Sequence, residues 1–187
     1  MVSKAREHLA AGRADEALVV ADAAAAQNDD IAVVHEVRAL ALTLMGRIEE
    51  ADRAFARAAE LYPEEYFDPF RLEHHEFDAA LEQTLSGLPE KFQDYLQNVE
   101  VGVEDVPSPE LIADGLEYDL LGVYVGSTAE SDDWGFPDRV VLFQRNLENI
   151  SPDRETLLAE IRDTLLHEVG HHFGMDEETL HEIENEN

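Results

Sequence analysis

Apolar residues in the first third of the chain recur every three to four positions, which is the spacing of one face of an α-helix. This pattern predicts helices near residues 3–11, 14–27, 32–45 and 48–61. Further along, the same spacing predicts a helix over residues 70–86 and a short one over 89–97, the latter begun by Pro89.

The first helical third contains an internal repeat. The hexapeptide Gly12-Arg13-Ala14-Asp15-Glu16-Ala17 recurs as Gly46-Arg47-Ile48-Glu49-Glu50-Ala51, an offset of 34 residues. A 34-residue period is typical of tetratricopeptide repeats, in which a glycine lies in the turn between two helices. We expect two such hairpins. Because free-standing arrays usually need three repeats, the last helix pair should pack against the next domain or a second copy of the chain.

Three later segments have the pattern of β-strands. Val99, Val101 and Val103 alternate with polar or small residues, which predicts a half-buried strand. Residues 120–125 are nearly all apolar and predict a more central strand. Residues 140–143 predict a third. With the preceding helices, these strands indicate an α+β fold: helical repeats over residues 1–65 and a second domain with a small sheet over 66–187.

The last long helix is predicted to begin at Ser151, with Pro152 at its first helical position. At about 100° per residue, apolar and functional positions separate onto opposite sides of this helix. The apolar side contains Leu158, Ile161, Leu165, Val169 and Phe173, with Leu166 beside them. The other side contains Glu160, Asp163, His167 and His171.

This second side carries the motif H-E-x-x-H at residues 167–171. Four residues apart on a helix, His167 and His171 lie one turn apart on the same face, so both imidazoles can bind one metal ion. Glu168 is close enough to reach a water molecule on that metal and to remove its proton. The motif therefore predicts a Zn²⁺ site with Glu168 as the catalytic base.

A third ligand is expected just beyond the helix. Gly174 can take a positive φ angle and end the helix, which lets the chain turn back toward the metal. Two acids follow, Asp176 and Glu177. The register H-E-x-x-H-x-x-G-x-x-E favours Glu177, and Asp176 is the alternative.

Residues 66–187 resemble the small bacterial zincin-like metallopeptidases with a metzincin-type motif. The matching features, in order, are Leu88-Pro89 with Phe92, Asn98 to Val101, Val103 to Asp105, Leu120 to Tyr124 with Gly126, Val141 to Phe143, and His167 to Gly174. The resemblance implies a compact α+β domain with a shortened zincin core. It also implies His167 and His171 as metal ligands and Glu168 as catalytic base. The family usually has Asp at the position of Glu177 and, like this chain, no Met-turn.

Composition limits the possible partners. The formal charge of −30 argues against nucleic acid and anionic membranes, because phosphate groups would be repelled. The same charge favours cationic peptides and metal ions, or serves only as a heavily solvated surface. No stretch approaches eighteen apolar residues, so no membrane span is predicted. Cysteine is absent, which fits a reducing cytoplasm.

Two functions follow as hypotheses. The first is a zinc-dependent peptidase acting on peptides or proteins, with His167, His171 and Glu177 as ligands. The second is an interaction module that binds a protein partner through residues 1–65, with a structural or catalytically idle metal site. The alternative for residues 1–65 is a structural cap on the peptidase domain. The motif alone does not separate peptide from non-peptide substrates.

Overall fold

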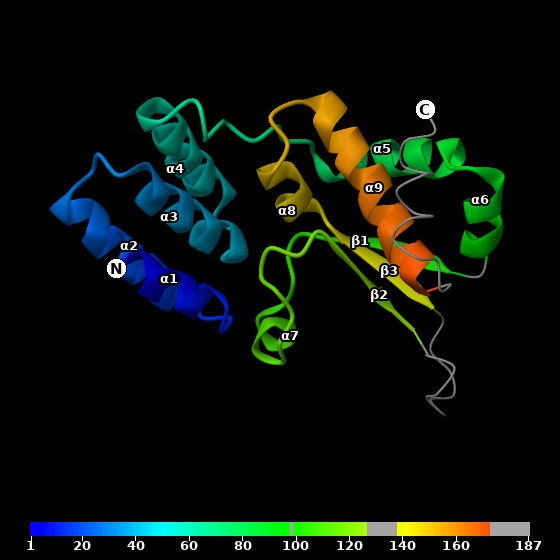
Figure 1. Ribbon diagram of the computed structural model, residues 1–187, viewed down its shortest axis with the longest axis horizontal. Helices are drawn as coiled ribbons and strands as arrows, with labels where there is room; N and C mark the ends of the chain where they lie inside the picture. Colours follow the sequence, from blue (N-terminus) through cyan, green and yellow to red (C-terminus); the bar gives the residue numbers. More distant parts are fainter. Residues whose placement is uncertain (98, 127–137, 173–187) are drawn as a thin grey trace.

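The computed structural model describes residues 1–97, 99–126 and 138–172 (Figure 1). Its first four helices form two antiparallel hairpins at one end of the long axis of the molecule. They are α1 (Val2–Leu9), α2 (Ala14–Gln27), α3 (Ala32–Leu44) and α4 (Ile48–Leu61). The four helices predicted from apolar spacing are thus confirmed, with ends that differ by at most two residues.

The two turns within these hairpins have the same geometry. Gly12 and Gly46 both have a φ angle of 70°. In each turn the next residue donates a backbone hydrogen bond of 2.9 Å to the fifth residue before it, Arg13 to His8 and Arg47 to Leu42. The 34-residue offset therefore exists in the backbone as well as in the sequence. The tetratricopeptide class itself stays a prediction.

Small side chains allow the helices of the hairpins to approach closely. Ala17 and Ala51, which occupy equivalent positions in the repeat, are both fully buried. They belong to the apolar cluster inside the hairpins, which also contains Ala5, Leu9, Leu18, Ala21, Val37, Ala39, Ala41, Leu42, Ala54 and Phe55. Alanine at the contact lets two helix backbones come together without leaving a void.

The remaining elements begin with α5 (His74–Gly87), four residues later than predicted. Glu73 and Glu76 form a capping box, in which each side chain accepts a hydrogen bond from the backbone of the other residue, and this sets the start of the helix. The elements that follow are α6 (Glu90–Leu96), β1 (Glu100–Glu104), α7 (Pro109–Ala113), β2 (Gly122–Val125), β3 (Arg139–Phe143), α8 (Gln144–Asn149) and α9 (Arg154–His172).

Within the described residues the sheet has the strand order β1-β3-β2. β1 pairs with β3 in parallel, and β2 pairs with β3 antiparallel. The expectation that residues 120–125 form the more central strand is wrong, because β3 occupies the centre and β2 lies at an edge. Residues 140–143 are buried on both faces, whereas Val125 at the end of β2 is 54% exposed.

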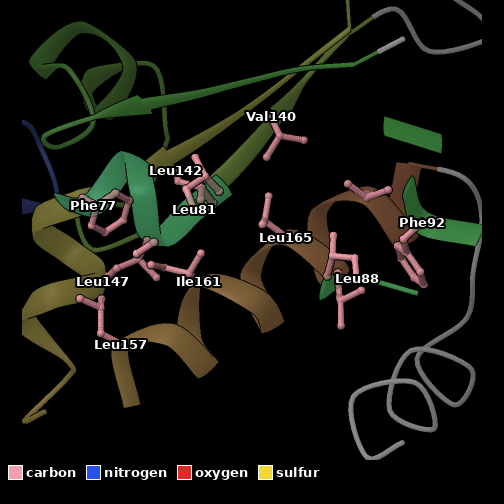
Figure 2. Packing of buried hydrophobic residues seen from close by; sticks show 13 residues of the cluster. Phe77, Leu81, Leu88, Phe92, Val140, Leu142, Leu147, Leu157, Ile161 and Leu165 are labelled. Carbon is pink, nitrogen blue, oxygen red and sulfur yellow. The ribbon is translucent and has the colours of Figure 1, made fainter. Parts of the chain in front are cut away.

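The main core lies between α9, α5 and one face of the sheet. Figure 2 shows side chains of α9 converging with those of α5 and β3. The fully enclosed members of α9 are Leu157, Ile161, Leu165, Leu166 and Val169. The predicted apolar side of this helix is confirmed for the described residues, with Leu157 in addition and Leu158 only partly buried. Phe173 lies outside them.

The predicted start of α9 is wrong by two residues, since the first helical residue is Arg154 and not Pro152. Asp153, and not Ser151, caps the helix, since its Oδ1 accepts a 2.8 Å hydrogen bond from the Thr156 N–H. Ser151 is fully buried and has other partners: its hydroxyl donates to the Leu147 carbonyl, and its own carbonyl accepts from the Phe70 N–H.

A fully buried carboxylate, Glu148 of α8, connects the junction after α4 to the second half of the chain. Its Oε1 accepts hydrogen bonds from the Leu72 N–H (3.1 Å) and the Gln144 amide (2.8 Å). Its Oε2 accepts from Arg71 (3.2 Å) and Arg145 (2.8 Å). A buried charge needs such compensation, because removal from water costs several kcal/mol.

One of these two arginines, Arg71, also contacts the helical hairpins. Arg71 also donates to Asp52 of α4 at 2.7 Å, and its guanidinium lies 5.9 Å from the centre of the Phe55 ring. At the turn between α1 and α2, a Cβ atom added at Gly12 would come within 2.7 Å of the Pro109 carbonyl oxygen, so this turn contacts α7 directly. The hairpins therefore pack against the rest of the chain. A domain boundary at residue 65 stays a prediction.

None of the described helices is long and apolar enough to cross a membrane.

Removing the Glu148 carboxylate should destabilise the protein strongly. We expect Glu148→Ala to lower the free energy of unfolding by about 3–5 kcal/mol, because two partly buried guanidinium groups lose their shared partner. Urea denaturation followed by circular dichroism measures the change. As a control, Glu60→Ala removes an exposed partner of Arg57 (3.3 Å) and should change stability by no more than about 0.5 kcal/mol. Equal effects of the two substitutions would contradict the role given to Glu148.

Candidate metal centre

The polar side of α9 lines a cavity of about 290 Å³. The apolar side of α9 is buried in the core, so the polar side, which lies opposite to it on the helix, faces outward. The lining residues are Glu160, Asp163, Thr164, His167 and Glu168 of α9 and Leu120, Leu121 and Gly122 at the start of β2. His167 is exposed, and Glu168 is partly buried. The structure thus brings the first predicted ligand and the predicted catalytic base to the same cavity.

Glu168 is hydrogen-bonded to the edge strand. The Tyr124 N–H donates to Glu168 Oε2 across an N···O distance of 3.0 Å. The Tyr124 N–H faces away from β3 because of the pairing between β2 and β3. The Phe143 N–H donates to the Leu121 carbonyl, and antiparallel pairs alternate between bonded and non-bonded positions. The backbone groups of Gly122 and Tyr124 therefore point away from β3, toward the side of β2 next to α9.

Gly122 allows α9 to lie this close to the strand. A Cβ atom built at Gly122 would be 2.7 Å from Thr164 Cγ2 and 3.1 Å from Leu142 Cδ2. Both distances are shorter than ordinary van der Waals contact. Thr164 is itself buried and lies one turn before His167 and Glu168. The absence of a side chain at residue 122 therefore helps to place the polar side of α9 against the edge of the sheet.

Two further groups at the site have raised pKa values. Burial, followed by the negative charge of Asp163, raises the pKa of Glu160. Burial also raises the pKa of the Tyr124 phenol, and the negative charge of the neighbouring Asp138 adds to this. The Tyr124 hydroxyl consequently keeps its proton at neutral pH and is associated with Asp138.

The other predicted ligands fall outside the described side chains. α9 continues through His172, so the backbone of His171 lies one helical turn beyond His167, as the motif requires. The side chain of His171 and both candidate third ligands, Asp176 and Glu177, lie outside the description. Among the side chains that are described, no three histidine or acidic groups form a metal site. Convergence of His167, His171 and Glu177 stays a prediction.

Comparison with protein families gives a match in the second half of the chain. Residues 96–187 match the sequence model of the zincin-like metallopeptidase family. The matched segment contains the whole sheet, α9 and the positions of both candidate third ligands. The match begins at residue 96, whereas the resemblance seen in the sequence begins at residue 66. It leaves out the helical hairpins and most of α6. No curated protein matches the chain.

The sequence pattern missed the strand side of this candidate site. Leu120, Leu121 and Gly122 line the cavity, yet the apolar run from 120 to 125 indicated only a buried strand. Gly122 was the available signal, because a glycine inside a strand often marks close approach of another element. The bond from the Tyr124 N–H to Glu168 depends on which strand forms the edge, and the sequence carries no local mark of that.

Filling the space at Gly122 should disturb the packing of α9. We expect Gly122→Ala to lower the free energy of unfolding by about 1–3 kcal/mol, because the new methyl group overlaps Thr164 Cγ2. Adding Thr164→Ser, which removes that methyl group, should restore part of the loss. A double-mutant cycle in urea measures the coupling.

Gly87→Ala is the matched control, since a Cβ atom there has nothing within 4 Å among the described atoms. Additive effects of Gly122→Ala and Thr164→Ser, with no coupling, would contradict the close approach described here.

Proposed function

We propose that the chain is a zinc-dependent peptidase in which Glu168 is the general base. One observation carries this proposal: His167 and Glu168 line a cavity beside the open edge of β2, and Glu168 is bonded to that edge. The match of residues 96–187 to zincin-like metallopeptidases supports the same reaction class.

The residues available suit zinc. His167 presents its imidazole to the cavity, His171 follows one turn later on the helix, and an acid at residue 177 or 176 completes a set of two nitrogen donors and one oxygen donor. This set is typical of catalytic zinc sites with an open position for water. When bound, zinc would polarise the substrate carbonyl and lower the pKa of that water.

Glu168 would carry the proton through the reaction. Its carboxylate takes a proton from the attacking water, whose oxygen bonds to the carbonyl carbon of the substrate. The carbon–nitrogen bond then breaks, and Glu168 delivers the proton to the leaving nitrogen. Before substrate binds, the Tyr124 N–H donates to Glu168 at 3.0 Å, which holds the carboxylate at the cavity.

The open edge of β2 is the part of the site suited to a peptide backbone. The outward N–H and C=O groups of Gly122 can pair with an extended chain, a common mode of peptide recognition. Antiparallel addition is the more stable arrangement per residue. A substrate bound in this way would lie in the cavity between the edge strand and α9.

Metal content and activity together test the proposal. Purified wild-type protein should contain about one zinc per chain and cleave peptides. His171→Ala should lose the metal, because one of two imidazole donors is removed. Glu168→Ala should keep the metal and lose activity by at least about 100-fold. Elemental analysis and a peptide-library assay measure the two quantities.

The third ligand is resolved in the same experiment. Glu177→Ala should lose zinc and Asp176→Ala should retain it, each serving as the control for the other. Equal zinc content in wild type, His171→Ala and Glu177→Ala would contradict the ligand assignment, whereas zinc without cleavage of any peptide would contradict the peptidase.

A groove on the helical hairpins favours the second candidate function, binding of a protein partner. The groove has a volume of about 590 Å³. It is lined by Arg6 of α1, Glu36 at the start of α3, and Tyr62 and Tyr66 after α4, among others. Tyrosines beside charged groups provide large contact area together with hydrogen bonds, which is common in binding surfaces.

Binding through this groove is testable on the full chain. Peptides selected from a random library on Glu168→Ala protein should bind about tenfold more weakly after Tyr66→Ala, because an aromatic contact is lost. Calorimetry measures the affinities, and zinc content should not change. Val19→Ala, at a position of α2 that is 69% exposed and outside the groove, is the control. Peptides that bind both variants equally would exclude the groove.

A further inference from the structure

The cavity beside Glu168 has two chemically different walls. Leu120, Leu121 and Gly122 form an apolar wall next to the edge strand. Glu160 and Asp163 lie on the opposite wall, one helical turn apart on α9. Among its described lining residues there is no lysine or arginine. Such a cavity is suited to a side chain with a long apolar stem and a cationic end, as lysine and arginine have.

The two acids differ in how their charge is balanced. Asp163 Oδ1 accepts a hydrogen bond of 3.2 Å from Arg162, which is the next residue back along the helix. Glu160 is only partly exposed and has no hydrogen bond or ion pair with any other described side chain. Its pKa is raised by burial and by Asp163. A cation in the cavity would counteract both effects. It would offset the repulsion between Glu160 and Asp163, and it would stabilise the Glu160 carboxylate in place of the water that burial removes.

The position of Glu160 along the site follows from helix and strand geometry. Gly122 lies against Thr164, and the Tyr124 N–H lies against Glu168, so β2 and α9 advance in the same direction. A peptide antiparallel to β2 therefore runs from Glu168 toward Glu160. Eight residues of helix span about 12 Å, which equals roughly three to four residues of extended peptide. Glu160 thus lies on the leaving-group side of the bond to be cut.

We propose that Glu160 and this cavity form a subsite for a lysine or arginine side chain located two to four residues after the scissile bond. The peptidase would accordingly prefer basic peptides. This inference rests on the proposed function, because it takes the bond near Glu168 as the site of cleavage. The formal charge of −30 acts in the same direction by concentrating cationic peptides near the surface. Glu160 then selects among them.

Binding to an unreactive protein tests the subsite without requiring turnover. Glu168→Ala protein is titrated with pairs of fluorescent peptides that differ only by lysine or norleucine at one position. The lysine peptide should bind about tenfold more tightly, and the ratio should fall toward one when Glu160→Gln is added. Glu160→Lys should reverse the preference toward a glutamate peptide. Higher salt should weaken the preference.

Glu155→Gln is the matched control, because it makes the same charge change on an exposed residue of α9 outside the cavity. A lysine-to-norleucine ratio near one, or a ratio that Glu160→Gln and Glu155→Gln change equally, overturns the subsite. Mass spectrometry of products from the active protein locates it: basic residues should be enriched two to four positions after the cut, and enrichment before the cut overturns the stated position. Absence of cleavage in every peptide overturns the proposed function and leaves the binding ratios to decide the subsite.

Discussion

Burial of the apolar side of α9 is the constraint on which the candidate site depends. Ile161, Leu165 and Val169 are fully enclosed between α5 and the sheet, so the helix cannot rotate without exposing them to water. Each large aliphatic side chain gains about 1.5–3 kcal/mol from burial. This packing turns Glu160, His167 and Glu168 toward the edge strand. The orientation of the candidate site residues is thus a consequence of the core, and Gly122 sets how closely helix and strand approach.

The second constraint is electrostatic and lies away from the site. Glu148 is enclosed in α8, the short helix that joins the central strand to α9. Arg71 shares this carboxylate with Arg145 and also binds Asp52 of the hairpins. The direction in which the chain enters α9 is therefore linked to the position of the helical hairpins. The formal charge of the protein is −30 and it has only 13 lysine and arginine residues, yet two of them bind this one buried carboxylate.

The edge strand gives the candidate site its second half. Among the described residues β2 pairs with β3 on one side only, and on its other side the Tyr124 N–H binds Glu168. The predicted catalytic base, the edge strand of the described sheet and a cavity with one acidic wall lie together. This combination supports hydrolysis of an extended peptide, and its acidic wall supports the preference for basic side chains.

Features that depend on neighbouring residues were determined by the sequence alone. The helices of the hairpins, their repeated glycine turns and the two sides of α9 follow from local spacing, and the structure confirms them. The H-E-x-x-H motif likewise predicted which family the second half would match. Features that depend on distant contacts were decided only by the tertiary structure. Asp153 caps α9 in place of Ser151, because the polar groups of Ser151 bind Leu147 and Phe70. In the described sheet β2 lies at the edge, because β3 pairs with β1 on its other side. Strand order and burial arise from packing between segments far apart in the chain, and no local pattern of side chains encodes them.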